Sequence, residues 1–501
     1  MLHNFDMFHP TFFVRCETEL NDAEVRTEVH KNDMRVYLTA NQSKPCFVEF
    51  QWKTAIEPSL LALGDAWERS YGELGFTTVG NSDRVMPWYF MLTDKDNCFC
   101  FGVKTQPSAF ISFRVTENGI TALADCRNGG MGTALNGREL LLCTFTYKAY
   151  AHTDPFSALC DFCRALCPAP LLPKVPIYGG NDWYNAYGHN SYETVCAAAQ
   201  IHAECARGIE NAPFMVIDDG WEQGSTAGPW LPNGKFGDMR AICNEIKGRG
   251  LRPGIWIRPL NTNDPAVDDT LKILRNGKRD YLDPTHPEVQ AMIRGDIARI
   301  RAWGYELLKH DYTTYDLFGD WGKDLSDAVP KTEGWHFYDR TKTNAEIVLD
   351  LYRLIREAAA GMLIIGCNTF SHLCAGLVEI NRTGDDTSGH DWSRTVKMGV
   401  NTLAFRLAQN GAFYLVDADC VGMPKGFIPW EKNRQWLELL ASSGTALFLS
   451  PDEVTDTQKR EIARAYQTAQ TLHTIKPVSW IDSITPAVWE IDGKKITFDW
   501  A

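Results

Sequence analysis

The feature that most constrains this fold is an alternation of short apolar runs with longer amphipathic segments across residues 175–450. Each run ends abruptly in polar or charged residues, and the segment after it is long enough for a helix. Eight runs can be counted: residues 175–185, 214–221, 252–260, 307–313, 362–368, 378–386, 412–420 and 446–450. Strands and helices that alternate eight times predict an α/β fold, a (β/α)8 TIM barrel.

The segments between the runs support this count because they end as helices end. Five of them close on or just before glycine, the usual C-terminal stop of a helix. They are residues 192–208, 236–250, 287–304, 343–361 and 392–411.

The residues before the barrel have a different pattern. Short alternating segments such as 35–39, 46–50 and 140–147 are separated by Asn, Asp, Gly and Pro, which predicts an antiparallel β-sandwich. A helical segment, 155–166, then leads into a proline-rich linker. We therefore expect a β-sandwich domain over residues 1–170 and the barrel over residues 171–450.

The last fifty residues are too few for a substantial third domain. Residues 451–501 should form a short C-terminal helix and β segment. The helix is predicted over 455–472 and the strands over 478–480, 487–491 and 495–500.

Composition excludes two classes of partner. The chain has 50 Lys and Arg against 63 Asp and Glu, a formal net charge of −13. Sequence-independent binding to nucleic acid or to an anionic membrane needs a basic face, and no run of about 18 apolar residues is present. We expect neither nucleic acid nor a membrane as partner.

The opening residues and the cysteines bear on location. Residues 1–6 lack the basic segment and apolar stretch of a secretory signal. Fifteen cysteines without regular spacing favour free thiols over disulfides or zinc. Both observations predict a cytoplasmic protein.

In a TIM barrel the functional side chains gather where the strands end. The residues that end these runs are rich in carboxylates and aromatic rings: Asp182, Trp183, Asp218, Asp219, Trp221, Trp256, Arg258, Lys309, Asp311, Cys367, Asn368, Arg382, Asp385, Asp386, Asp417 and Asp419. Any one aspartate could simply cap a helix, and any one tryptophan could belong to the core. Carboxylates on several strand ends of one face, however, repel one another, which indicates a chemical use.

Three uses compete: binding a divalent metal, cleaving a glycosidic bond, and hydrogen-bonding a polyol. A metal site would usually add His or Glu ligands, and the only histidine at these ends, His310, should point out of the barrel because it alternates with Lys309 and Asp311. Glycoside hydrolysis needs one ionised and one protonated carboxyl group, and tryptophan faces can stack on a sugar. We therefore expect sugar chemistry with no metal and no cofactor.

Three motifs carry a resemblance to a known clan: Phe-Met-Val-Ile-Asp-Asp-Gly-Trp at 214–221, Lys-His-Asp at 309–311, and Arg-Thr-Gly-Asp-Asp at 382–386. With them, residues 175–450 resemble the retaining α-galactosidases of glycoside hydrolase families 27 and 36, including raffinose synthase-like members, and are closest to family 36. His310 replaces the clan's usual aromatic residue. The loop at 368–372 lacks the glycine-rich pattern of family 36, which leaves the identity of the sugar open.

The resemblance implies roles for individual residues. Asp311 would be the nucleophile and Asp385 the acid/base, with Asp386 in reserve. The remaining residues would bind substrate: Trp183, Asp218, Asp219, Trp221, Trp256, Arg258, Lys309, Asn368 and Arg382. Trp183 and Trp221 would wall the apolar face of the sugar.

The expected function is that of a retaining glycoside hydrolase acting on terminal α-galactosyl residues through a covalent glycosyl-aspartate. The alternatives are a transglycosidase of the raffinose synthase type, an α-glycosidase for a modified galactose such as N-acetylgalactosamine, an α-glucosidase-like enzyme, and a non-catalytic carbohydrate-binding barrel. The expected partner is an oligosaccharide or glycoside. The sequence is also compatible with a homo-oligomer.

Overall fold

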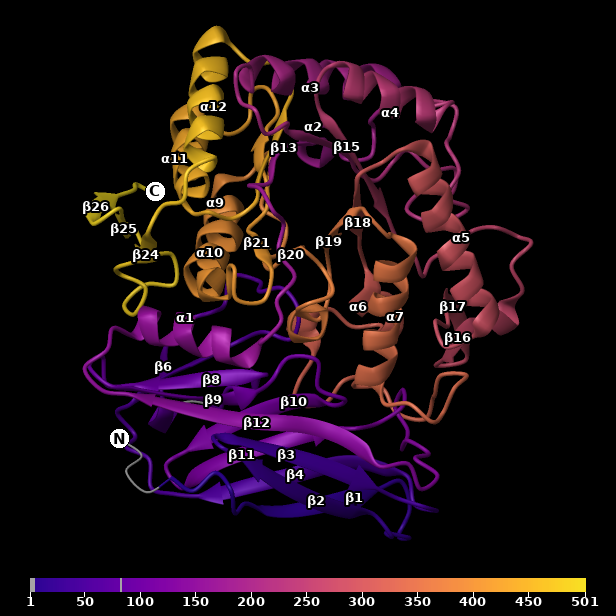
Figure 1. The fold of residues 1–501 in the computed structure, drawn as a ribbon, viewed down its shortest axis with the longest axis vertical. Coiled ribbons are helices and arrows are strands. Elements are labelled where there is room, and N and C mark those ends of the chain that lie inside the picture. Colours follow the sequence, from indigo (N-terminus) through magenta and orange to yellow (C-terminus); the bar gives the residue numbers. More distant parts are fainter. Residues whose placement is uncertain (1–4, 82) are drawn as a thin grey trace.

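The computed structural model describes residues 5–81 and 83–501, and Figure 1 shows their arrangement. Two antiparallel sheets lie at one end of the molecule, the barrel lies at the other, and a small C-terminal sheet lies beside the barrel. The prediction of a cytoplasmic location used residues 1–6, and residues 1–4 of these lie outside the described residues.

The two N-terminal sheets form the predicted sandwich. The first sheet has the order β1 (Thr11–Cys16), β4 (Pro45–Lys53), β11 (Gly119–Asp125), β10 (Phe110–Thr116) and β7 (Met86–Pro87). The second has the order β2 (Glu24–His30), β3 (Asp33–Thr39), β12 (Leu140–Tyr150), β9 (Cys98–Val103), β8 (Tyr89–Thr93), β5 (Leu61–Gly64) and β6 (Thr77–Thr78).

Aromatic side chains from both sheets fill the space between them. Phe50 of β4 meets Phe145 of β12 edge to face, with ring centroids 5.2 Å apart. Trp52 of β4 meets Phe101 of β9 in the same way at 5.1 Å. All four rings are at most 3% exposed, so the alternation read from the sequence does place these residues in a shared core.

The barrel strands are those predicted, and all but β23 are shorter than their apolar runs. Their order is β21 (Leu415–Asp417), β20 (Ile380–Arg382), β19 (Leu363–Gly366), β18 (Leu307–His310), β15 (Arg252–Ile257), β14 (Phe214–Ile217), β13 (Tyr178–Asn181) and β23 (Leu447–Pro451), followed by β22 (Val421–Met423) at the edge. The Ala446 N–H donates to the Val416 carbonyl at 2.9 Å. This bond joins β21 to the residue that directly precedes β23. The predicted fold class is confirmed.

Helices surround these strands in Figure 1. Most lie on the segments that the sequence indicated: α3 (Tyr192–Cys205), α4 (Met239–Gly248), α5 (Pro287–Trp303), α7 (Asn344–Ala358), α9 (Trp392–Thr395) and α10 (Asn401–Arg406). Helix α11 (Trp430–Ser442) lies outside the five predicted helical segments. Gly304 ends α5 in the left-handed region, with φ at 104°, which a side chain would disfavour. Shorter helices α2 (Trp183–Ala186), α6 (Thr313–Phe318) and α8 (Ser371–Cys374) follow strand ends, and a hairpin, β16 (Lys272–Arg275) and β17 (Lys278–Leu282), precedes α5.

The C-terminal segment contains the predicted helix and three strands, with one strand displaced. Helix α12 (Asp456–Ala469) packs on α11, and β24 (Ile475–Pro477), β25 (Val488–Ile491) and β26 (Lys494–Thr497) form an antiparallel sheet. The strand expected at 478–480 is instead β24, because pairing with β25 runs from Ile475 to Pro477 and the chain turns after it.

The sandwich and the barrel are joined by backbone pairing as well as by packing. Helix α1 (Pro155–Leu166) lies between them in Figure 1. The segment 65–71, which leaves the sandwich after β5, reaches the loop after β20. There the Ser70 N–H donates to the Thr383 carbonyl at 2.9 Å, and the Asp385 N–H donates to the Ser70 carbonyl at 2.7 Å. No helix in the described part of the chain has both the length and the apolar character needed to cross a bilayer.

Candidate active site

A cavity opens at the carboxyl ends of the barrel strands. It is lined by Asn181, Trp183, Tyr184, Asp218, Asp219, Trp256, Lys309, Asp311, Tyr312, Cys367, Arg382, Asp386 and Asp419. Eight of the twelve residues that the sequence predicts to be catalytic or substrate-binding are in this list, so the structure brings them to one place. No three His, Cys, Asp or Glu side chains among the described residues are arranged to hold a metal ion.

One wall of the cavity is built at the ends of β14 and β18. The Lys309 Nζ lies 2.7 Å from the Asp218 Oδ2, and the same oxygen accepts from the Asn181 amide at 2.7 Å. Burial opposes the charge on Lys309, but Asp218 outweighs it and raises the lysine pKa well above its usual value. The buried pair therefore presents a cationic donor and an anionic acceptor to the cavity at fixed positions.

Asp311 stands directly after β18 and its carboxylate is held at both oxygens. The Tyr312 N–H donates to Oδ1 at 2.7 Å, and the Trp256 Nε1 donates to Oδ2 at 3.2 Å. Trp256 can reach it because the register of β15 and β18 pairs Trp256 with Lys309. Tyr312 has a φ of 64°, an uncommon conformation for a bulky residue that turns the chain just after the carboxylate.

Two further carboxyl groups on this wall are driven toward the protonated form. Burial, and then the neighbouring charge of Asp218, raises the pKa of Asp182 to about 7. Burial, and then Glu222, raises the pKa of Asp219 to about 8. Thr226 donates to the Asp219 Oδ2 at 2.8 Å, while Oδ1 is buried without a hydrogen-bond partner among the described residues.

The opposite wall is built at the ends of β20 and β21. The Arg382 Nη2 lies 3.0 Å from the Asp386 Oδ1 and 2.6 Å from the Asp419 Oδ2. Asp419 also accepts from the Thr387 N–H at 2.7 Å and from the Tyr184 hydroxyl. Burial raises the pKa of Asp386, but Arg382 and then Arg69 outweigh burial, so the net shift is downward.

The two adjacent aspartates on this wall lie in different surroundings. Asp386 lines the cavity, and 40% of its side chain is exposed. Asp385 does not line the cavity: its side chain is 13% exposed and pairs with Arg69 at 3.1 Å and with Arg394 at 2.8 Å. Of the two candidates for the acid/base position, the reserve residue, Asp386, lines the cavity and Asp385 does not.

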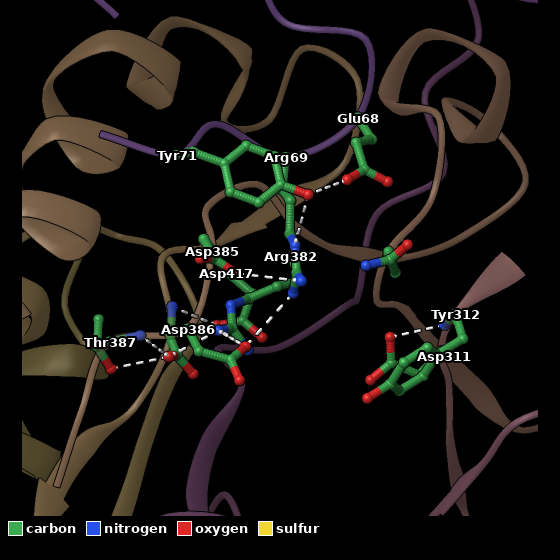
Figure 2. Close-up of polar contacts among 12 residues, drawn as sticks. Glu68, Arg69, Tyr71, Asp311, Tyr312, Arg382, Asp385, Asp386, Thr387 and Asp417 are labelled. Atoms are coloured by element: carbon green, nitrogen blue, oxygen red, sulfur yellow. Dashed lines mark hydrogen bonds and ion pairs between the residues drawn. The ribbon is translucent and has the colours of Figure 1, made fainter. Parts of the chain in front are cut away.

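An arginine from the N-terminal region completes this wall. In Figure 2 the side chain of Arg69 reaches toward the aspartates that follow β20, and the carboxylate of Asp311 lies across the open space from that of Asp386. The Arg69 Nη1 is 3.3 Å from the Asp386 Oδ1, and the residue is 8% exposed. Asp386 is thus paired with one arginine from the barrel and one from the segment 65–71.

The preceding residue, Glu68, connects the same segment to the loop that follows Asp311. It is fully buried and accepts hydrogen bonds from the hydroxyls of Thr314 and Tyr71 and from the Gly322 N–H at 2.9 Å. Thr314 lies three residues after Asp311, so segment 65–71 contacts the loops that carry both Asp311 and Asp386.

Three predicted substrate-binding residues do not line the cavity. Trp221 is fully buried between Trp230 and Trp303 and donates to the Trp256 carbonyl at 2.9 Å, so it belongs to the core. Arg258 and Asn368 both lie behind the cavity lining, each held by other partners.

The Arg258 guanidinium pairs with Asp316 through three hydrogen bonds of 2.6, 3.0 and 3.2 Å and lies 4.0 Å from the centre of the Tyr312 ring. Its position supports Tyr312 and not the substrate. The Asn368 side chain contacts Thr314, and its backbone adopts a φ of 57°. Sequence alone could not show that these side chains point away from the cavity.

His310 points out of the barrel interior, as its alternation predicts. Its ring packs 5.8 Å from the ring of Tyr352 on α7. Neither ring nitrogen has a hydrogen-bond partner among the described residues, and burial lowers the pKa of His310 to about 3. The histidine is therefore a neutral core residue at the position where the clan has an aromatic ring.

Sequence reasoning missed four lining residues or neighbours of the lining. Asn181 ends β13, Tyr184 directly follows the predicted Trp183, and Tyr312 directly follows Asp311. Their closeness to a strand end was therefore a signal that the sequence contained. Arg69 lies more than 300 residues before its partners and had no such signal.

Comparison with known proteins places the fold. No protein-family model and no curated protein matches the chain. Among solved structures, the chain is similar to an α-galactosidase from Thermus thermophilus in complex with p-nitrophenyl α-D-galactopyranoside, with a TM-score of 0.64, 17% identity, and coverage of 97% of this chain and 96% of that one. It is also similar to the family 36 α-galactosidase AgaA from Geobacillus stearothermophilus, with a TM-score of 0.61, 14% identity, and coverage of 93% and 70%.

A related barrel from another family is similar to a lesser degree. The family 31 dextranase from Flavobacterium johnsoniae, complexed with glucose, gives a TM-score of 0.54 at 10% identity over 91% of this chain and 64% of that one. These similarities show that the chain has the fold of the family 36 α-galactosidases, in which a sandwich precedes the barrel.

Proposed function

We propose that this protein is a retaining glycoside hydrolase that acts on terminal α-galactosyl residues. One observation carries the proposal: two aspartates, Asp311 and Asp386, line one cavity from strands β18 and β20, together with a buried Asp218–Lys309 pair that can bind hydroxyl groups. The shared fold with α-galactosidases supports the choice of reaction but does not decide the sugar.

Asp311 is the nucleophile in this proposal. Its carboxylate accepts hydrogen bonds from the Tyr312 N–H and the Trp256 indole, which hold its two oxygens in place. It attacks the anomeric carbon and forms a covalent glycosyl ester, which water then hydrolyses with net retention. The left-handed turn at Tyr312 fixes the direction of the attacking oxygen.

Asp386 is the acid/base. As the acid it gives a proton to the leaving oxygen, and as the base it takes a proton from the water that attacks the ester. The arginines beside it lower its pKa, so the base role is favoured at neutral pH and the acid role strengthens as the pH falls. Asp385 holds Arg69 and Arg394 in place.

The sugar hydroxyls bind at the β14–β18 wall. Asp218 and Lys309 offer an acceptor and a donor at fixed positions. Asp219, with a pKa raised to about 8, can present its carboxyl O–H and leaves one buried oxygen to be satisfied. An epimer that leaves such buried groups unpaired should bind poorly.

Chemical rescue tests the proposal. Wild type should hydrolyse p-nitrophenyl α-galactopyranoside, Asp311→Gly should lose turnover by orders of magnitude, and azide should restore it with β-galactosyl azide as the product. The matched control is Asp482→Gly, which removes a surface carboxylate whose side chain is 78% exposed and should leave turnover unchanged.

Two results would contradict the proposal. Activity on the α-glucoside but not on the α-galactoside would reject the sugar, and an α-galactosyl azide from the rescue would reject attack by Asp311. An α-galactoside that wild type binds but never turns over would favour the carbohydrate-binding alternative.

A further inference from the structure

Four aromatic rings form a continuous row that begins in the cavity wall and ends at the surface. Trp183 lines the cavity, and its ring centroid lies 5.6 Å from that of Tyr187. Tyr187 lies 4.8 Å from His390, and His390 lies 3.9 Å from Phe427. The row therefore leads from the cavity to the rim in three steps.

All four residues lie in segments that follow barrel strands at their carboxyl ends. Trp183 and Tyr187 follow β13, His390 follows β20, and Phe427 follows β22. The Tyr187 hydroxyl accepts from the Gly389 N–H at 3.2 Å, which attaches the row to the loop of Asp386. From its second ring onward, the row therefore follows the loop that carries Asp386, the proposed donor of a proton to the leaving group.

Core packing does not explain the row. Phe427 is 55% exposed, His390 is exposed, and Tyr187 and Trp183 are only partly buried. Single exposed apolar side chains are ordinary, but a contiguous exposed aromatic strip beside a catalytic cavity marks a binding surface. Tyr187 also adopts a φ of 44°, an uncommon conformation for a bulky residue that sets the direction of its ring.

We propose that the Trp183–Tyr187–His390–Phe427 row binds the leaving-group side of an oligosaccharide, that is, the sugar units that follow the α-galactosyl residue. This inference rests on the proposed function and extends it to the substrate class. Aromatic faces pack on the apolar faces of pyranose rings and tolerate different hydroxyl patterns, so the row favours chain length over sugar identity.

The test compares kcat/KM for an α-galactosyl disaccharide and for the tetrasaccharide stachyose. In wild type the longer substrate should be favoured. Phe427→Ala and His390→Ala should each lower the ratio of tetrasaccharide to disaccharide by about three- to tenfold, since one aromatic contact is lost. Phe427→Tyr should restore the ratio, and the control Leu472→Ala, at a site that is 92% exposed, should leave it unchanged.

The remaining outcomes would overturn the inference. A ratio that stays the same in both alanine variants shows that the row does not bind the leaving group. An equal loss on both substrates shows that the rings only support the loops. If wild type shows no measurable hydrolysis of stachyose, of the disaccharide or of the nitrophenyl glycoside, the proposed function fails and this inference fails with it.

Discussion

The two walls of the cavity are built from different parts of the chain. The β14–β18 wall consists of side chains within two residues of a strand end, and its central pair, Asp218 and Lys309, lies entirely within the barrel. The β20–β21 wall depends on Arg69, which arrives from the segment after β5 in the sandwich. The β14–β18 wall is therefore made by the barrel alone, whereas the β20–β21 wall is complete only when the sandwich is packed against the barrel.

This difference separates two kinds of control over the reaction. In the proposed reaction the β14–β18 wall selects the sugar hydroxyls, because Asp218 and Lys309 are held by each other inside the barrel. The β20–β21 wall sets the charge on Asp386, and part of that setting comes from outside the barrel. Substitutions on the two walls should therefore give different signatures.

The largest effect on activity is expected on the β20–β21 wall, in a comparison of substitutions at Asp386 and Asp385. Asp386→Asn should lower kcat/KM on an α-galactosyl oligosaccharide by about 10²–10⁴-fold, since it removes the proton donor. Asp385→Asn is the matched control and should cost less than about tenfold because that side chain does not line the cavity. The reverse order of effects would return the acid/base role to Asp385.

A smaller effect is expected for Lys309→Met on the β14–β18 wall. Removing the ammonium leaves Asp218 buried without its charge partner, which should cost about 3–5 kcal/mol in the free energy of unfolding, together with most of the activity. Urea denaturation measures the first quantity. Lys247→Met, whose partner Glu306 is partly exposed at 3.3 Å, should change stability by less than about 1 kcal/mol. Similar losses in both variants would mean that the buried pair has no special weight.

The subtlest change is a shift in pH dependence for Arg69→Met. Arg69 stabilises the ionised form of Asp386, so removing it should raise the Asp386 pKa. Because the acid must hold its proton, the alkaline limb of the kcat/KM profile on an oligosaccharide should move to higher pH. Arg114→Met breaks another ion pair in the same molecule, with Asp327 at 3.1 Å, and should leave the limb in place. A shift to lower pH would contradict the proposed charge relation.

Much of the barrel and one of its walls could be predicted from the sequence. The alternation of apolar runs with amphipathic segments, and the glycines that end the helices, placed the strands. Residues next to strand ends, such as Asp218 and Asp311, had to lie at one edge of the sheet. Which of Asp385 and Asp386 lines the cavity could not be predicted, because it depends on where the chain turns after β20. That turn is set by the pairing of Ser70 with the loop, a contact between distant segments.

Side-chain direction was the other limit. Trp221 and Arg258 lie on the expected runs, but their side chains are satisfied by a carbonyl and by Asp316, away from the cavity. The domain boundaries at 170 and 450 remain a prediction. So do the roles assigned to individual residues.

The strand-like pairing at Ser70 has a consequence for how the protein unfolds. Because the backbone of the N-terminal region bonds to the loop that carries Asp385 and Asp386, that loop cannot keep its shape after the sandwich detaches. Heating should therefore abolish catalysis together with the first loss of structure in the sandwich, as one cooperative event. We expect a barrel expressed without its first 170 residues to have the Asp218–Lys309 pair but a disordered loop at Asp385 and Asp386.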